Sequence, residues 1–344
     1  MIVLVDDEDR ENEGDFVGAA QFLTVEQVVK MSRFASGIIT VPMPHSWLER
    51  LHVTPMLQEN AERMRTAFTV SVDAKTGIAT GSSAADRVTT IRRLADPSSR
   101  AQDFVRPGHV NPLVVREGGV LKRPGHTEAS HDLMVLAGLH PVAVLCEIMG
   151  DDGEMTRLPE LREVALKHGL ELGTIADVIR YRRTTEKLVT ATSARRVQTR
   201  LGEFMTTCFR SSVDDGRYTA FVRGEIDAES PTLVRIHTGS PVDDLVGLLG
   251  APRQGQLESA LLRLAEEASG VLLYIEQSTQ SELPDERAYG IGAQILRELG
   301  VRKFRLLTNT PRRRAALEGF GLRLVETLPL EHGGVVLVLE GGRR

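Results

Sequence analysis

The sequence predicts an α/β (α+β) protein of two domains, each a mixed sheet with flanking helices. The chain has 344 residues, which suggests about two domains of ~150 residues. Hydrophobic residues make up 41% and charged residues 26%, an ordinary globular composition. Short apolar runs alternate with segments of helical periodicity in both halves, as in α/β and α+β folds. A polar stretch from 182 to about 195 separates the predicted domains, 1–183 and 190–344.

Elements of the first half follow from apolar spacing and capping residues. The apolar run at 2–5, ended by acids, is typical of a buried strand. Thr24 and Gln27 have the spacing of a capping box and predict the start of a helix. Ser83 begins a second helix that continues through Leu94. The other predicted elements are strands at 38–41 (stopped by Pro42), 68–72 and 142–149, and helices at 159–168 and 174–182.

The second half repeats the same alternation of strands and helices. A helix at 256–268 carries leucines and alanines on one face. A second helix at 291–299 is closed by Gly300. The predicted strands lie near 204–210, 218–224, 232–237, 271–275, 304–307 and 335–340.

Composition excludes several classes of protein. The net charge is −5 and the isoelectric point is about 6.0, so nothing favours nucleic acid as the main partner. Two cysteines, Cys146 and Cys208, are too few for a disulfide framework or an all-cysteine zinc site. No apolar run approaches the ~18 residues of a membrane span, and the N-terminus lacks the pattern of a signal peptide. We therefore expect a cytoplasmic protein without a membrane partner.

The densest polar signal is residues 6–15, with seven carboxylates in ten positions. A solvated acidic loop is the ordinary explanation of such a run. This run directly follows a strand and is interrupted by Arg10 and Gly14. Carboxylates clustered at a strand end are typical of a site for Mg²⁺, which prefers oxygen ligands.

Two further motifs carry candidate chemistry. The tetrapeptide Arg-Pro-Gly-His occurs at 106–109 and again at 123–126, and each copy predicts a turn that aims a histidine. Arginine, the Thr127 hydroxyl and turn amides would together suit a sugar phosphate. Glu147 interrupts an apolar strand, and a buried carboxylate must be paired or neutralised. Glu147 is therefore a candidate general acid or base, with a structural ion pair as the alternative.

These motifs, with Thr80–Arg87 and Cys146-Glu147, make residues 1–183 resemble 3,4-dihydroxy-2-butanone 4-phosphate synthase. The resemblance implies conversion of ribulose 5-phosphate to 3,4-dihydroxy-2-butanone 4-phosphate and formate, with Mg²⁺ or Mn²⁺ and no organic cofactor. It also implies a homodimer with active sites at the subunit interface. By the same resemblance Glu11 and His126 are metal ligands, and His109 and Glu147 are essential for activity. The substrate-binding residues that it implies are Arg10, Glu11, Asp15, Arg123, Pro124, Gly125, His126, Thr127 and Glu147.

The second half resembles GTP cyclohydrolase II in its framework but departs from it at the zinc site. The three cysteine positions of that family are Ser240, Ala251 and Arg253 here, so we expect no zinc and no GTP hydrolysis. Asp285, Arg287, Thr308 and Gln256 match family site residues and would be vestigial; the first two could equally form a surface ion pair. A nucleotide-binding or dimerisation module, and a fully bifunctional enzyme, are the alternatives.

Overall fold

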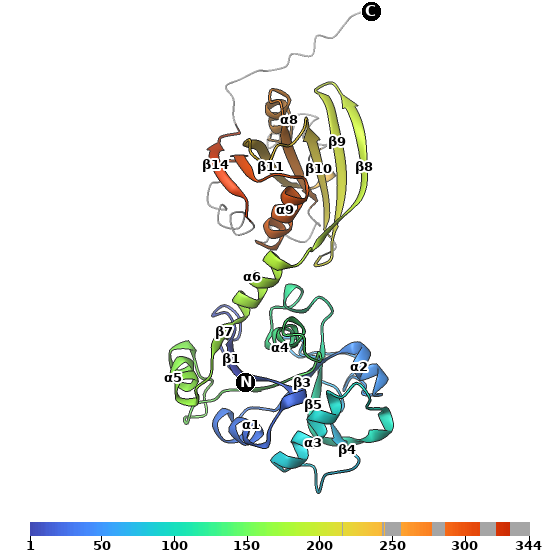
Figure 1. Cartoon of the computed structure of the whole chain (residues 1–344), viewed down its shortest axis with the longest axis vertical. Helices are drawn as coiled ribbons and strands as arrows, with labels where there is room; N and C mark the ends of the chain where they lie inside the picture. The colour runs from blue at the N-terminus through green and yellow to red at the C-terminus, as the bar shows by residue number, and fades with distance from the viewer. Residues whose placement is uncertain (215, 243, 245–255, 277–285, 310–320, 331–344) are drawn as a thin grey trace, which may run out of the picture. The chain divides into compact units, whose positions relative to one another are not determined.

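The computed structural model describes the chain except for residues 215, 243, 245–255, 277–285, 310–320 and 331–344. It divides into two compact units, Met1–Arg182 and Arg183–Arg344, each with one seven-stranded sheet (Figure 1). The boundary falls at the start of the polar stretch that the sequence indicates. Among the described residues, no helix is long and apolar enough to cross a membrane.

The sheet of the first unit is mixed, in the order β4-β5-β3-β6-β2-β1-β7. Strand β1 pairs with β2 antiparallel and with β7 parallel. Strand β6 pairs antiparallel with β2 and β3, and β3 pairs parallel with β5. The strands are β1 (Ile2–Val5), β2 (Gly14–Ala19), β3 (Thr40–Pro44), β4 (Val72–Ala74), β5 (Phe104–Val115), β6 (Ala143–Glu147) and β7 (Leu172–Thr174).

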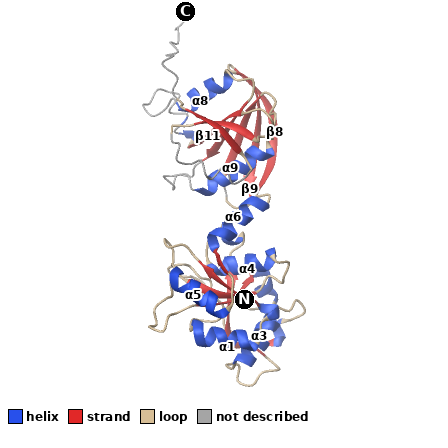
Figure 2. Cartoon of the chain, turned by 60° about the vertical axis from the view of Figure 1, so that its left-hand side comes forward, coloured by secondary structure: helices blue, strands red, loops and turns tan. Residues whose placement is uncertain are grey.

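Helices cover both faces of this sheet (Figure 2). Side chains alternate between the faces along each strand, so Phe16 joins one apolar cluster and Val17 the other. Helices α1, α3 and α5 pack in the first cluster, and α4 and α6 in the second. The helices are α1 (Val25–Lys30), α2 (His45–Arg50), α3 (Ala84–Leu94), α4 (His126–Leu136), α5 (Leu158–His168) and α6 (Ile175–Thr185), with a π-helical turn at Met31–Ala35 and short 3₁₀ turns at Ala20–Phe22, Ala101–Asp103 and Gly119–Leu121.

The capping signals are confirmed. Thr24 and Gln27 form both hydrogen bonds of the capping box at the start of α1. The Ser83 side chain accepts from the backbone N–H of Asp86 at the start of α3. Helix α5 ends at Gly169, whose φ of 62° suits a residue without a Cβ.

Three strand predictions in the first unit are wrong in their bounds. Strand β3 begins at Thr40 and continues through Pro42. Its pairing with β6 is limited to Thr40, so beyond that residue one side of β3 lacks a strand partner and tolerates a missing N–H. In place of a strand at 68–72, Phe68 and Thr69 form isolated bridges, and β4 begins at Val72. The predicted strand at 142–149 is shorter, Ala143–Glu147.

The second unit has the strand order β14-β13-β11-β12-β10-β9-β8. Strands β8, β9 and β10 form an antiparallel series, while β12, β11, β13 and β14 are parallel to one another. Helix α8 packs on β11 and β12 around Leu233, Leu264 and Leu272. The elements are β8 (Val189–Thr199), β9 (Gly202–Ser211), β10 (Arg217–Arg223), β11 (Thr232–Gly239), α8 (Gln256–Ala265), β12 (Gly270–Glu276), α9 (Glu286–Glu298), β13 (Lys303–Leu307) and β14 (Arg323–Leu328). The strand predicted at 335–340 lies outside the described residues.

Candidate active site

The acidic loop between β1 and β2 is shaped by Asp6. This buried carboxylate accepts the backbone N–H groups of Glu11, at 3.1 Å, and Glu13, at 2.8 Å. It also accepts a bond of 2.8 Å from Arg10 Nη1. The loop is therefore folded around an internal carboxylate and presents the Glu11 side chain, which a freely solvated acidic run would not do.

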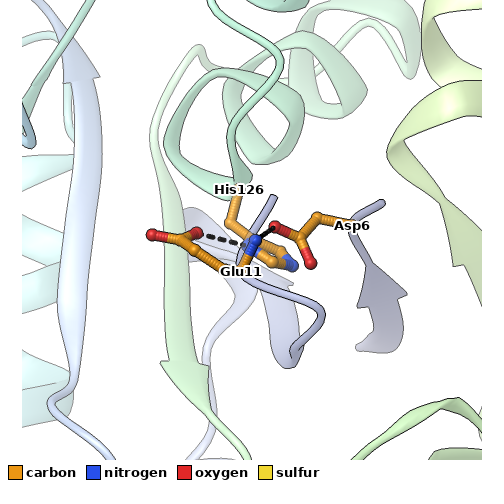
Figure 3. Close-up of side chains that lie close together, drawn as sticks. All are labelled: Asp6, Glu11 and His126. Atoms are coloured by element: carbon orange, nitrogen blue, oxygen red, sulfur yellow. Dashed lines mark hydrogen bonds and ion pairs between the residues drawn. The ribbon is translucent and has the colours of Figure 1, made fainter. Parts of the chain in front are cut away.

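His126 and Glu11 meet at this loop. His126 is the first residue of α4 and is 7% exposed. Its Nε2 lies 3.2 Å from the carbonyl oxygen of Leu4, and its Nδ1 lies 3.9 Å from Glu11 Oε2. Figure 3 shows Asp6, Glu11 and His126 converging, and one ligand atom from each lies within 4.8 Å of the others. A neutral histidine that donates Nε2–H to a carbonyl keeps Nδ1 available as a metal ligand.

Asp15 completes the cluster from strand β2. It is 2% exposed, and its Oδ1 has no hydrogen-bond partner among the described residues. That oxygen lies 3.9 Å from His126 Nε2. A buried carboxylate oxygen without a donor is costly, and a bound cation or ligand nearby would satisfy it. Next to it, the donor set of Asp6, Glu11 and His126, two carboxylates and one imidazole, fits a divalent ion.

Burial and charge shift the pKa values of this cluster. Burial raises the pKa of Asp15 to about 7, with Glu147 adding to the rise and His126 opposing it. Burial lowers the pKa of His126, but the carboxylates of Asp15, Glu11 and Asp6 outweigh it and raise the pKa to about 9. The contact with His126 holds the pKa of Glu11 below its usual value.

Glu147 lies at the end of β6, directly opposite Asp15. It is half-buried at the strand end, so the expectation of a fully buried carboxylate is wrong. Its Oε2 accepts the backbone N–H of Ile38 at 2.8 Å. A Cβ at Gly37 would lie 2.5 Å from the same oxygen, so a glycine is needed for this close approach of the chain.

The second Arg-Pro-Gly-His segment leads into α4 and gathers two guanidinium groups. Gly125 is the N-cap residue of α4, and a Cβ there would lie 3.0 Å from Arg10 Nη2 and closer still to Arg123 Nη1. Arg123 donates to Glu128 at 2.7 Å and to the Met64 carbonyl at 3.0 Å. The first N–H groups of a helix have no intrahelical partners. Two arginines beside a helix N-terminus make a typical anion site.

The first Arg-Pro-Gly-His segment is not a turn, so that prediction is wrong. Residues 106–109 lie within β5. Val72 of β4 is opposite Val110 of β5, and the next residue, Asp73, is opposite Val105, so the four residues between them are left out of this pairing. The segment is thus an extended bulge, and bulges redirect side chains. It places His109 Nδ1 2.7 Å from Asp73 Oδ2, while the His109 N–H donates to Asp73 Oδ1 at 2.9 Å.

Asp6 and Asp73 are the residues of this region that the sequence analysis did not single out. Asp6 belongs to the acidic run, but it differs from the neighbouring acidic residues in being buried, and the sequence does not show burial. Asp73 carries no local signal, because its partner His109 lies 36 positions away in the sequence. The structure brings together Arg10, Glu11, Asp15, His126 and Glu147, and places Arg123, Pro124, Gly125 and Thr127 at the start of α4.

In the second unit, the carboxyl ends of β11 and β12 hold a hydrogen-bonded cluster. His237 Nε2 lies 3.0 Å from Asp244 Oδ1, and Tyr274 Oη donates to Asp244 Oδ2 at 2.6 Å. Ser240 follows β11 directly, and Thr308 follows β13. Ala251, Arg253 and Asp285 lie outside the described residues, as does the side chain of Arg287.

Comparison with known proteins gives the family of each unit. The family model of 3,4-dihydroxy-2-butanone 4-phosphate synthase matches residues 1–181. The family model of GTP cyclohydrolase II matches residues 190–283 and 278–329.

Two plant proteins are similar to almost the whole chain. The bifunctional riboflavin biosynthesis protein RIBA 1 of Arabidopsis thaliana is 47% identical to this chain. The match covers 96% of this chain and 66% of that protein. The monofunctional riboflavin biosynthesis protein RIBA 2 of the same plant is 46% identical, over 96% of this chain and 74% of its own length.

Two solved structures are similar as well. RibBX of A. baumannii, described as a two-domain 3,4-dihydroxy-2-butanone 4-phosphate synthase, has a TM-score of 0.78 and 38% identity over 95% of both chains. A 3,4-dihydroxy-2-butanone 4-phosphate synthase in complex with two magnesium ions has a TM-score of 0.52 and 41% identity, covering 54% of this chain and 91% of that one.

The three-layer fold, with its cluster of carboxylates and histidine at one edge of the sheet, defines the first unit as an enzyme domain of the α/β class. The sequence matches then fix which enzymes it is related to. The chain belongs to the 3,4-dihydroxy-2-butanone 4-phosphate synthase family.

Proposed function

We propose that the first unit converts D-ribulose 5-phosphate to 3,4-dihydroxy-2-butanone 4-phosphate and formate in riboflavin biosynthesis. One observation carries the proposal: the Glu11–His126 pair lies beside the two guanidinium groups at the start of α4. A cation site next to an anion site suits a sugar phosphate, because the phosphate binds positively charged groups and the sugar hydroxyl oxygens can bind a metal cation. The family match of residues 1–181 supports the same reaction.

Glu11 and His126 would hold Mg²⁺ or Mn²⁺, with Asp6 close enough to contribute. A divalent ion bound there supplies electrostatic stabilisation of negative charge that develops on substrate oxygens. The magnesium ions of the related synthase structure support this choice of cation. Asp15 would accept a hydrogen bond from the substrate, because its buried Oδ1 lacks a donor.

The phosphate group would bind at the start of α4. Arg10, Arg123 and the Thr127 hydroxyl supply donors, and the Pro124–Gly125 turn leaves room for close approach. The free N–H groups of the first helical turn favour negative charge. Phosphate binding here would orient the sugar carbons toward Glu147 and Asp15.

Glu147 and His109 would move protons in this reaction. Ile38 N–H occupies Glu147 Oε2, which leaves Oε1 for proton transfer. Asp73 holds His109 Nδ1, which leaves Nε2 for the same purpose. Enolisation, dehydration and loss of formate each need a proton transfer, so two acid–base groups fit the reaction better than one.

The family resemblance supports a homodimer with these groups at the subunit interface. We propose that this homodimer works in the cytoplasm.

For the second unit we propose a nucleotide-binding or dimerisation module without cyclohydrolase activity. Zinc ligands in proteins are thiolate, imidazole and carboxylate groups, and Ser240, Ala251 and Arg253 at the three cysteine positions offer none of them. Thr308 and Gln256 remain as residues that could contact a nucleotide. The competing proposal, a bifunctional enzyme, is favoured by the name of the Arabidopsis RIBA 1 protein.

One experiment separates these functions. The purified full chain is incubated with ribulose 5-phosphate and Mg²⁺, and separately with GTP and Zn²⁺, and formate is measured in each. Formate from the first mixture alone supports the proposal. No formate from the first mixture contradicts the synthase assignment, and formate from both establishes the bifunctional enzyme.

A further inference from the structure

Arg10 occupies two sites at once. Its Nη1 donates to Asp6 Oδ2 at 2.8 Å and to Glu11 Oε2 at 2.6 Å. Its side chain is 14% exposed, and Asp6 is 1% exposed. The same guanidinium turns its Nη2 toward Gly125 at the start of α4. One positive group therefore links the carboxylates of the cation site to the place where an anion would bind.

A divalent ion and the Arg10 guanidinium would compete for the same oxygen. Glu11 Oε2 is the atom that lies 3.9 Å from His126 Nδ1, and it is already bonded to Arg10. An ion shared by Glu11 and His126 would lie within a few ångströms of the guanidinium, and like charges at that distance repel strongly in a partly buried site. The ion can bind well only if Arg10 leaves Glu11.

The displaced guanidinium lies near the start of α4, where a Cβ at Gly125 would lie within 3.1 Å of Arg10 Nη2, Arg123 Nη1 and Glu128 Oε2. The Glu128 carboxylate there already accepts from Arg123 at 2.7 Å, so Arg10 would share an acceptor that another guanidinium uses. An anion at the start of α4 would supply a further acceptor, because it accepts hydrogen bonds from both arginines. Cation and anion should therefore bind cooperatively.

We propose that Arg10 couples the two sites: it neutralises the acidic loop when the cation is absent and moves to the anion when both ligands bind. This inference rests on the proposed cation and phosphate sites. Coupling of this kind is reciprocal, so the anion must raise cation affinity by the same factor as the cation raises anion affinity. It makes Arg10 a coupling residue as well as a substrate contact.

The test is calorimetric titration of the full chain with Mg²⁺, with and without saturating inorganic phosphate. Titration of Mg²⁺ into phosphate alone serves as the blank. In the wild type, phosphate should raise Mg²⁺ affinity about fivefold or more, within the usual range of coupling between sites. In Arg10→Gln, Mg²⁺ alone should bind more tightly than in the wild type, and the effect of phosphate should fall to nearly none.

Two further variants keep the result unambiguous. Arg10→Lys keeps the competing charge, so its Mg²⁺ affinity without phosphate should stay near the wild-type value. This variant still provides a measurement if Arg10→Gln fails to fold. Arg157→Ala removes a guanidinium that donates to backbone carbonyls of the same loop, at Glu11 and Asn12, and should keep wild-type coupling.

Two results would overturn the inference: Arg10→Gln binding Mg²⁺ no more tightly than the wild type, or phosphate having the same effect in both proteins. Because no turnover is measured, failure here is distinct from failure to release formate from ribulose 5-phosphate.

Discussion

Asp15 on β2 and Glu147 on β6 are paired directly across two antiparallel strands. Partners in such a pair point to the same face of the sheet, and here that face carries α4 and His126. The pair puts two carboxylates side by side, one buried and one half-buried. The buried member has its pKa raised to about 7, first by burial and then by the charge of Glu147. Glu147 is anchored separately, because its Oε2 accepts the backbone N–H of Ile38 at 2.8 Å.

We predict that Glu147→Gln retains substrate binding but loses turnover. The amide keeps the size of the side chain and can still accept the Ile38 N–H, but it cannot carry a proton. General acid–base groups contribute roughly 10²–10⁴-fold to rate, so kcat should fall by that order while KM changes little. Steady-state formate release measures both constants. Glu154→Gln, in an exposed loop, is the control; near-normal kcat in Glu147→Gln would make Glu147 structural.

Removal of either metal ligand should abolish most activity. Glu11→Gln and His126→Ala each take away a donor of the cluster, and a chelator should have the same effect on the wild type, reversed by Mg²⁺. His126 is buried at the start of α4 and not on a loop as Glu11 is, so its replacement should also lower the thermal midpoint modestly. Formate release is compared with melting curves for each variant. Full turnover in excess EDTA would contradict the metal assignment.

Metal affinity should rise with pH up to about 9. Without metal, the pKa of His126 is raised to about 9 and that of Asp15 to about 7. A ligating imidazole must be neutral, so at pH 7 metal binding has to release the His126 proton. The affinity therefore increases as pH rises toward 9 and then levels off.

Asp15→Asn provides the check on this pH dependence. Asp15 is the largest charge that raises the pKa of His126, so its neutralisation should move the plateau to lower pH. Titration of Mg²⁺ by calorimetry at several pH values, in buffers of different ionisation enthalpy, gives both affinity and proton release. The remote variant Asp73→Asn should keep the wild-type profile. Mg²⁺ affinity that does not change between pH 6 and 9 would show that His126 is not a ligand.

Asp73→Asn should lower kcat without raising KM. Asp73 holds His109 through both its backbone N–H and its ring, and a Cβ at Gly81 would lie 2.6 Å from the same ring nitrogen. An asparagine can present an N–H to Nδ1 and so favour the wrong tautomer, and changes to such supporting partners cost roughly 10–100-fold. Steady-state kinetics test this, with Asp151→Asn as an exposed control. Unchanged kcat would separate His109 from the reaction.

Local signals predicted the elements that local interactions determine. The capping box of α1, the N-cap of α3 and the end of α5 need residues at most four positions apart, and the structure confirms them. The two Arg-Pro-Gly-His copies show the limit of such reasoning. They are identical in sequence, but the first lies within β5 between residues that pair with β4 and becomes a bulge, while the second precedes α4. Their neighbours, brought close by long-range pairing, decide the conformation, and the same holds for the contact of Asp73 with His109.

The second unit should contain no zinc and should remain folded in a chelator. Ser240 follows β11 where the family has its first zinc cysteine, and close by Asp244 accepts from Tyr274 and contacts His237. These contacts join a residue of β11 to a residue of β12 through Asp244. Asp244→Ala removes the acceptor of these bonds and should cost about 1–3 kcal/mol of stability, whereas EDTA should leave the unfolding transition unchanged. Elemental analysis, melting curves and a GTP-dependent formate assay on the full chain test these expectations together. One zinc per chain with formate released from GTP would contradict them, and the second unit would then be an active cyclohydrolase.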